Sequence, residues 1–440
     1  MSLADAASPP ATSPESPWKL LALVFGIALV ARLIVIAFYP DPWQFDAYQR
    51  WAARDHLWVQ VWLPATQVVV WTVAKLGGSI FALRLVMATL AAATVTMGAA
   101  LAHRLGGRDS VWLYIPMALF GPYLLWSVVP YQESTLLLAL FGGLLLQDKR
   151  PVLGALVMGT LAFCRYEGWP LLVVFIVVQR RWSSLWCLWG VGLYFLLDGL
   201  GLNEPYAASP DSFEDWEGLE NKLTWRNTKR LFEGGWYEAS NAGLPWVFLG
   251  ALFALRSFPR WRVETWVLVL AFLGQAAATI GWMFSLGLTF SRMAVLPGMV
   301  IAVVAAAAVG RRWNPMRRDV RLALVGTSLA IAAWSVARTV PDVNRMFRTM
   351  RREVEVVRVI ESCPEDSWAM RPRKHPGPRR RHDACEVVQG LTNLRAGQDF
   401  DCETWNWGGT EPTMRVEWDR QRKVYVYERV SGEPQGDCPL

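Results

Sequence analysis

Long apolar runs separated by short polar segments constrain the fold of this chain more than any other feature. Leu20–Tyr39 and Phe81–Ala102 are two such runs. A run of about twenty apolar residues crosses the hydrocarbon core of a bilayer as a helix, because only a helix satisfies its own backbone polar groups there. Charged residues make up 18% of the chain, against roughly a quarter in soluble proteins. The runs therefore predict a polytopic membrane protein.

The apolar runs predict an all-α fold with about eleven transmembrane helices. We place them at residues 18–39, 80–103, 109–128, 132–147, 151–167, 168–179, 183–202, 244–257, 262–285, 291–310 and 321–339. Residues 151–179 are too long for one span and are interrupted around Arg165, so we expect two spans that meet there. Residues 62–78 contain Pro64, Gln67 and Lys75, and a span there would invert the downstream topology, so we expect an interfacial helix instead.

Loop charge predicts the orientation of these spans. Basic residues dominate the short loops at 103–108, 148–150, 180–181, 256–262 and 311–321, whereas residues 203–243 hold eight acidic and four basic residues. Short basic loops stay in the cytoplasm, so the outer loops are 40–79 and 203–243. The prediction is a multi-pass plasma (inner) membrane protein with its N-terminus inside and its C-terminus outside. The net charge of +7 then reflects topology signals and not nucleic-acid binding.

The two ends of the chain differ in composition from the apolar region at 18–340. Residues 1–17 are rich in Ser, Pro and Ala and carry no basic segment, which predicts a disordered cytoplasmic tail and not a signal peptide. Residues 341–440 are polar, with a helix expected at 343–361 and strand-like pieces such as 423–427. Four of the six cysteines lie in this segment: Cys363, Cys385, Cys402 and Cys438. In an oxidising compartment they predict a small extracytoplasmic α+β domain held by two disulfides.

The first outer loop is the most informative polar stretch, because Asp41 and Asp46 follow the end of the first span closely. A solvated interfacial loop explains them without any function. The alternative is that one of the carboxylates acts as a general base toward an acceptor hydroxyl. Tyr48 and His56 lie in the same loop as candidate substrate contacts, although a single interfacial His often has no specific role.

Arg165 and Glu167 form a second polar feature, at the outer end of a predicted span. Ionised groups at membrane depth are costly and are kept for pairing or function. One interpretation is an ion pair between the two side chains. The other is an arginine fork on a lipid-linked phosphate, whose oxygens a guanidinium matches in a bidentate way. Three further charged residues lie at or near the outer starts of predicted spans: Arg84, Glu133 and Arg292. Each of them alone would be an interfacial anchor.

The sequence contains no phosphate-binding Gly-rich loop, HExxH, GxSxG or CxxC motif. Soluble-nucleotide and common hydrolase chemistries are therefore unsupported. We expect no cofactor and no metal site, since the four C-terminal cysteines lack the close pairs typical of zinc binding.

Several short motifs over about residues 18–310 resemble the GT-C superfamily of membrane glycosyltransferases, and most of all the branch of protein O-mannosyltransferases and the lipid A aminoarabinose transferase. The motifs are Phe45-Asp46-Ala47-Tyr48, Trp62-Leu63-Pro64, the entry at 78–85, the element at 127–134 and the Gly-rich span at 159–165. Many relatives have Asp-Glu in the first loop, whereas Ala47 follows Asp46 here, which leaves Asp41 or Asp46 as the base.

The resemblance implies inverting transfer of a sugar from a polyprenyl-phosphate carrier to a lipid, glycan or protein acceptor on the outer face. Asp46 would be the general base, and Glu133 would orient the acceptor or the sugar. Arg165, together with Arg84 or Arg292, would stabilise the departing lipid phosphate. A lipid or glycan transporter or flippase is the main alternative, although the chain shows no internal repeat. A non-enzymatic assembly protein with a partner-binding module at 341–440 is a third reading.

Overall fold

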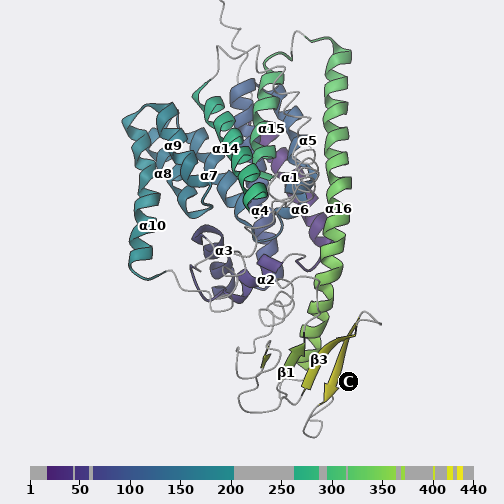
Figure 1. The fold of residues 1–440 in the computed structure, drawn as a ribbon. Helices are drawn as coiled ribbons and strands as arrows, with labels where there is room; N and C mark the ends of the chain where they lie inside the picture. The colour runs from purple at the N-terminus through teal and green to yellow at the C-terminus, as the bar shows by residue number, and fades with distance from the viewer. Residues whose placement is uncertain are drawn as a thin grey trace, which may run out of the picture.

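The computed structural model describes residues 17–42, 45–58, 63–202, 262–286, 295–313, 316–362, 368–371, 400–401, 414–419 and 424–429. Figure 1 shows a bundle of helices with a small sheet beyond one end. The predicted N-terminal tail to residue 16, the outer loop 203–243 and the predicted span 244–257 lie outside the described residues.

The first half of the chain supplies most of the bundle. Its helices are α1 (Trp18–Phe38), α2 (Phe45–Ala52), α3 (Pro64–Lys75), α4 (Ile80–Gly106), α5 (Asp109–Ala118), α6 (Gly121–Trp126), α7 (Gln132–Leu146), α8 (Pro151–Gly159), the 3₁₀ turn η1 (Thr160–Phe163), α9 (Gly168–Gln179), the 3₁₀ segment η2 (Trp182–Leu188) and α10 (Trp189–Gly199). The later helices are α14 (Val263–Leu286), α15 (Val295–Gly310) and α16 (Arg318–Ser362).

Three described helices are long and apolar enough to cross a membrane: α1, α4 and residues 318–356 of α16. Five further apolar stretches are 10–17 residues long. The predicted span 109–128 forms two helices, and Pro116 lies inside the first of them, where it removes a backbone hydrogen bond. The helices support an α-helical membrane protein.

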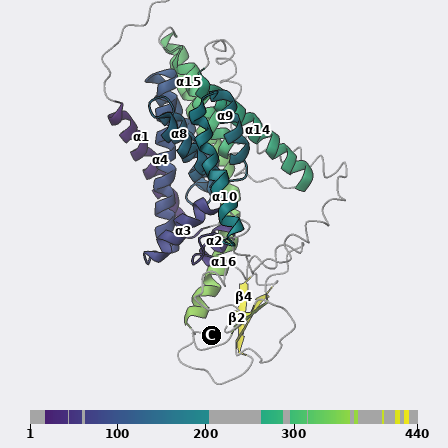
Figure 2. The same ribbon diagram turned by 90° about the vertical axis from the view of Figure 1, so that its left-hand side faces the viewer.

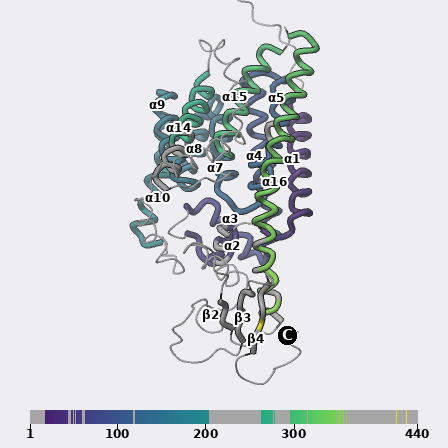
Figure 3. Tube along the Cα trace, turned by 45° about the vertical axis from the view of Figure 1, so that its right-hand side comes forward, coloured from purple at the N-terminus to yellow at the C-terminus, as the bar shows by residue number. Residues whose placement is uncertain are grey.

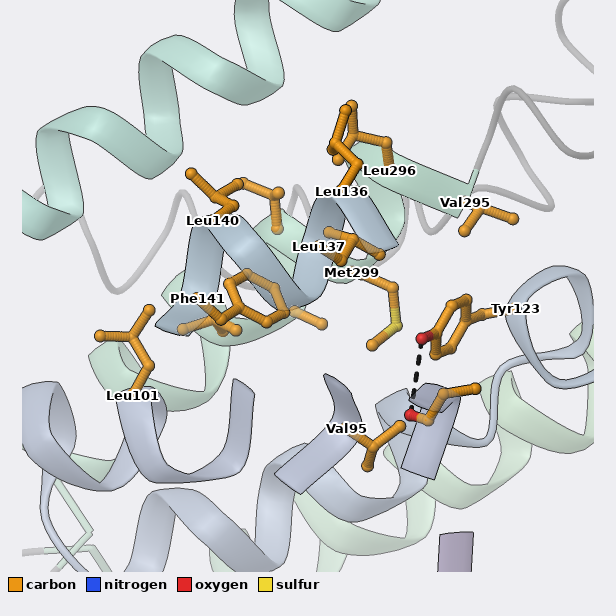
Figure 4. Packing of buried hydrophobic residues seen from close by; sticks show 14 of the residues in the cluster. Val95, Leu101, Tyr123, Leu136, Leu137, Leu140, Phe141, Val295, Leu296 and Met299 are labelled. Atoms are coloured by element: carbon orange, nitrogen blue, oxygen red, sulfur yellow. Dashed lines mark hydrogen bonds between the residues drawn. The ribbon is translucent and has the colours of Figure 1, made fainter. Parts of the chain in front are cut away.

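The bundle is centred on α4, which packs against α1, α5, α7 and α15. Figure 2 shows α1 beside α4. Leu137 and Phe141 of α7 and Met299 of α15 meet in the core with Tyr123 of α6, and all four are buried (Figure 4). Every residue of α15 is buried, which explains why its sequence is apolar all round.

Small residues allow the central helices to approach closely. A Cβ placed on Gly106 of α4 would overlap the backbone of Ala307 in α15, and one on Gly310 would lie 2.7 Å from the Cβ of Ser110 in α5. The Gly121 backbone NH of α6 donates to Ser335 Oγ of α16 at 2.7 Å. Close backbone approach through small residues is how membrane helices gain packing energy without a hydrophobic driving force.

The longest element is α16, whose 45 residues correspond to roughly 67 Å of helix. Figure 3 shows it running along the bundle and beyond α2 and α3 to the strands. The predicted span 321–339 and the predicted helix 343–361 are therefore parts of one helix, which continues through Pro341. No break separates residues 340 and 341, where we expected the boundary between two domains.

The sheet has four described strands, β1 (Trp368–Arg371), β2 (Phe400–Asp401), β3 (Met414–Asp419) and β4 (Val424–Arg429), in the order β2-β1-β3-β4. β1 pairs in parallel with β2 and β3, and β3 pairs antiparallel with β4, where Val416 faces Tyr427. β4 contacts α16. Burial and, second, the nearby Glu355 of α16 raise the pKa of Tyr427 to about 12. The four cysteines predicted to form disulfides lie outside the described residues.

Polar contacts join several helices at the end of the bundle away from α2 and α3. Arg104 pairs with Asp148 and, at 2.7 Å, with Glu264 of α14. Arg104 also donates to the carbonyl of Leu145 at 2.8 Å, and Arg311 Nε donates to the carbonyl of Leu105 at 2.6 Å. Residues in or next to several loops that the charge pattern assigned to the cytoplasmic side thus lie at the same end of the bundle.

Candidate functional site

Helices α2 and α3 lie at the end of the bundle nearest the sheet (Figure 1), and the predicted site residues that the structure describes belong to these helices or to segments near them. Asp46 is the second residue of α2. Asp41 lies in the bend before α2, partly buried and close enough to Arg84 to interact electrostatically. Arg292 lies outside the described residues.

Arg84 is fully buried in the first turns of α4. Its guanidinium donates to the carbonyls of Tyr39 and Pro40 and, at 3.3 Å, to the carbonyl of Val128. A buried guanidinium needs hydrogen-bond acceptors, and the carbonyls just after the end of α1 accept from its Nη1. Arg84 therefore fixes the segment that leads into Asp41, which differs from the lipid-phosphate contact we predicted for it.

Tyr48 of α2 contacts the segment that follows α1. Its hydroxyl donates to the carbonyl of Pro42 at 2.9 Å, and its ring is buried. The ring packs with Met350 and Val354 of α16 and with Ile80 of α4. We predicted a substrate contact for Tyr48, whereas the structure gives it a role in ordering α2 against α16.

Helix α3 links the first outer loop to α7. Gln67 is fully buried, and its Nε2 donates to the carbonyls of Ala53 at 2.8 Å and Arg50 at 3.2 Å, at the end of α2. One residue earlier, the hydroxyl of Thr66 lies 3.3 Å from that of Thr135, in the first turn of α7. The predicted interfacial helix thus positions α2 beside the start of α7.

The second feature of the site is a buried ion cluster of Glu133, Arg165 and Glu167. Arg165 binds Glu167 through both arms of its fork, with Nε–Oε2 at 3.1 Å and Nη2–Oε1 at 2.6 Å. Its Nη1 donates to Oε1 of Glu133. The side chains are 6% exposed for Glu133 and 16% for Arg165. Of our two interpretations of Arg165 and Glu167, the structure contains the ion pair.

One carboxylate oxygen of this cluster is unused. Oε2 of Glu133 is buried and has no hydrogen-bond partner among the described residues. Gln275 of α14 is a further polar neighbour, which hydrogen-bonds Glu167. Gln275 is itself buried. The sequence did not point to Gln275, because a polar residue within an apolar run carries no signal of which helix it faces.

Aromatic side chains from the turn that carries Arg165 and Glu167 form a second group of contacts, which no sequence signal marked. Trp169 makes edge contacts with Tyr194 and Phe195, with ring centroids 5.0 and 5.6 Å apart. The ring centroids of Tyr166 and Trp169 lie 6.2 Å apart, and those of Trp58 and Tyr194 lie 5.0 Å apart. We call these five residues the aromatic cluster. Two of its residues, Tyr166 and Trp169, come from the same turn as Arg165 and Glu167.

Arg32 of α1 is another polar residue that the sequence analysis missed. It is fully buried, and it donates to Ser127 Oγ at 2.8 Å and to the carbonyl of Ala28 at 2.9 Å. Its guanidinium carbon lies 4.9 Å from the centroid of the Tyr123 ring, a favourable cation–π geometry. A lone charge within an apolar run is a signal that could have identified it.

The remaining candidates lie at the margin of the site. His56 is exposed, and next to it Asp55 pairs with Lys75 at 3.1 Å. The hydrogen bond from Lys75 holds the pKa of Asp55 below its usual value, against a smaller opposing effect of burial. Cys164 and Cys187 are free and buried. Within the described ranges, no three His, Cys, Asp or Glu side chains are grouped to hold a metal ion.

Contacts from the distal part of α16 predict that this helix orders α2. The Tyr39 hydroxyl donates to Asn344 Oδ1 at 2.6 Å, and the Tyr39 ring meets Phe347 edge-on at 5.2 Å. Val354→Ala removes part of the packing on Tyr48, so we expect roughly tenfold faster backbone hydrogen exchange in residues 45–52. Mass spectrometry of the full-length protein in nanodiscs measures this. Arg351→Ala, whose side chain is 63% exposed, is the control, and equal exchange in both variants would contradict the ordering role.

Comparison with models of known protein families gives no match for this chain, and no curated protein matches its sequence significantly.

Proposed function

We propose that this protein is an inverting glycosyltransferase that moves a sugar from a polyprenyl-phosphate carrier to an acceptor hydroxyl at the membrane surface. One observation carries the proposal. Helix α2, which includes Asp46, and the buried Glu133–Arg165–Glu167 cluster occupy the same end of a membrane-type helix bundle and are joined through α3. Carboxylates gathered beside an apolar bundle suit a hydroxyl acceptor and a lipid-borne donor.

The proposed reaction is a single displacement at the anomeric carbon of the sugar. The acceptor oxygen forms a bond to that carbon while the bond to the phosphate oxygen breaks, and the polyprenyl phosphate leaves with the electron pair. The carboxylate of Asp46, or of Asp41, takes the proton of the acceptor hydroxyl. Glu133 accepts a hydrogen bond from a substrate hydroxyl.

The observed contacts of Arg165 and Arg84 change the roles that the sequence suggested for them. Arg165 is held by two carboxylates and Arg84 by backbone carbonyls, so both act by positioning their partners. Arg292 keeps its proposed role as a contact of the lipid phosphate.

The activity assay supplies purified full-length protein with radiolabelled polyprenyl-phosphate sugars and membrane extract, and then locates the label. Asp46→Asn is expected to lower transfer by about 10²–10⁴-fold, the usual contribution of a general base, without affecting membrane insertion. Asp55→Asn, which removes an exposed carboxylate just after α2, is the matched control. Transfer at the wild-type rate by Asp46→Asn, Asp41→Asn and the double variant would remove the proposal.

For topology, we propose about eleven spans with an inside N-terminus and an outside, disulfide-stapled α+β segment at 341–440. The basic loops at the bundle end away from α2 support this orientation. In sealed right-side-out vesicles, His56→Cys should react with a membrane-impermeant thiol reagent, and Arg150→Cys should react only after permeabilisation. The reverse pattern would invert the topology.

A further inference from the structure

The positive charge of Arg165 is already balanced within the ion cluster by more than one carboxylate. All three guanidinium nitrogens of Arg165 contact carboxylate oxygens of Glu133 and Glu167. Two carboxylates surround one guanidinium, so the cluster carries a formal excess of one negative charge when all three groups are ionised. A phosphate that approached this cluster would meet carboxylates that already occupy the fork, and like charges at close range cost free energy. The cluster is therefore a poor phosphate site.

The same cluster is well suited to hydroxyl groups. An ionised carboxylate only accepts hydrogen bonds, and Oε2 of Glu133 is buried with no partner in the described part of the chain. An unpaired buried acceptor costs free energy, so this position favours a ligand that donates a hydrogen bond. The bond from Arg165 to the other oxygen holds the carboxylate in place.

The aromatic cluster supplies the second half of a carbohydrate-binding arrangement. Tyr166 and Trp169 flank Glu167 in the same turn, and the side chain of Tyr166 is 53% exposed. The face of an aromatic ring carries a partial negative charge, and it attracts the C–H groups on the apolar face of a pyranose. Sites for small ligands combine such rings with a few fixed polar groups.

We infer that Glu133 Oε2 and the rings of Tyr166 and Trp169, which belong to the turn whose Arg165 binds Glu133, form the subsite for the hexose of the lipid-linked donor, and that the lipid phosphate binds elsewhere. This inference rests on the proposed function and changes what the 165–169 turn recognises, from the phosphate to the sugar.

The test compares two lipids on the full-length protein in nanodiscs: polyprenyl phosphate, and polyprenyl phosphate that carries a hexose. Glu133→Gln and Tyr166→Leu are expected to weaken binding of the hexose-bearing lipid on the order of tenfold each, as the loss of a hydrogen bond to a charged group or of a ring contact predicts. Binding of the sugarless lipid should stay within about twofold of wild type. Trp182→Leu, which replaces an 88% exposed ring outside the cluster, is the matched control.

Comparison of the two lipids distinguishes failure of the sugar subsite from failure of the proposed function. Equal weakening of both lipids by Tyr166→Leu, in protein with an unchanged melting temperature, would make the turn a phosphate or lipid-chain contact and overturn the subsite. Unchanged binding of both lipids in Tyr166→Leu and Glu133→Gln would also overturn it. Wild-type protein that binds neither lipid would overturn the proposed function, and the subsite with it.

Discussion

Replacing Arg165 by Met is expected to lower the free energy of unfolding by about 3–5 kcal/mol, because it leaves the buried Glu133 and the partly buried Glu167 without their shared cation. The side chain of Glu133 is 6% exposed and that of Glu167 is 21% exposed, so water compensates little. Thermal and denaturant unfolding in detergent micelles measures the loss. Lys75→Met is the matched control, since it breaks an exposed pair whose side chains are 50% and 68% exposed, and it should cost less than about 1 kcal/mol.

A second variant tests whether the stability loss in Arg165→Met comes from unpaired charges or from altered packing. Replacing all three members together, as Glu133→Gln, Arg165→Met and Glu167→Gln, removes the unpaired charges and should recover much of the stability that Arg165→Met loses. Transfer activity should stay low in the triple variant, because Glu133 is then unable to accept hydrogen bonds as a carboxylate. If Arg165→Met proved as stable as Lys75→Met, the cluster would not be buried as the structure shows.

Gly106→Ala is expected to be the most damaging single-methyl change among those considered. The added Cβ meets the backbone of Ala307 in α15, and backbone yields less readily than a flexible side chain. We expect destabilisation of about 3 kcal/mol, in the upper part of the range for overpacked cores. The melting temperature of the purified protein reports the effect.

Gly326→Ala is the matched control for this substitution. Gly326 is also in a helix, but no atom within 4 Å would contact its new Cβ, so only helix propensity changes. Alanine is favoured over glycine by about 1 kcal/mol in a helix interior, and the protein should melt at the same or a higher temperature. Similar destabilisation by both variants would show that α4 and α15 are not in close contact.

The structure and the sequence agree best on the positions of apolar helices. The run from Leu20 to Tyr39 became α1 and the run from Phe81 to Ala102 became most of α4, because an apolar run of this length is stable in a bilayer as a helix. The interruption after Phe163 also lies where Arg165 predicted it. The sequence did not predict the single helix through residues 340 and 341, since the change from an apolar to a polar segment suggested a boundary that the continuous α16 does not have.

The apolar runs themselves determined that this chain builds membrane-type helices and that its polar candidates cluster at helix ends. They determined this because hydropathy and charge act on each segment through the solvent around it, without reference to the rest of the fold. Only the tertiary structure decided what each arginine binds. Arg84 donates to a carbonyl just after α1, and Arg165, in the turn before α9, donates to Glu133 of α7. Such partners depend on helix rotation and neighbours, which the packing of buried surfaces sets and local sequence does not encode.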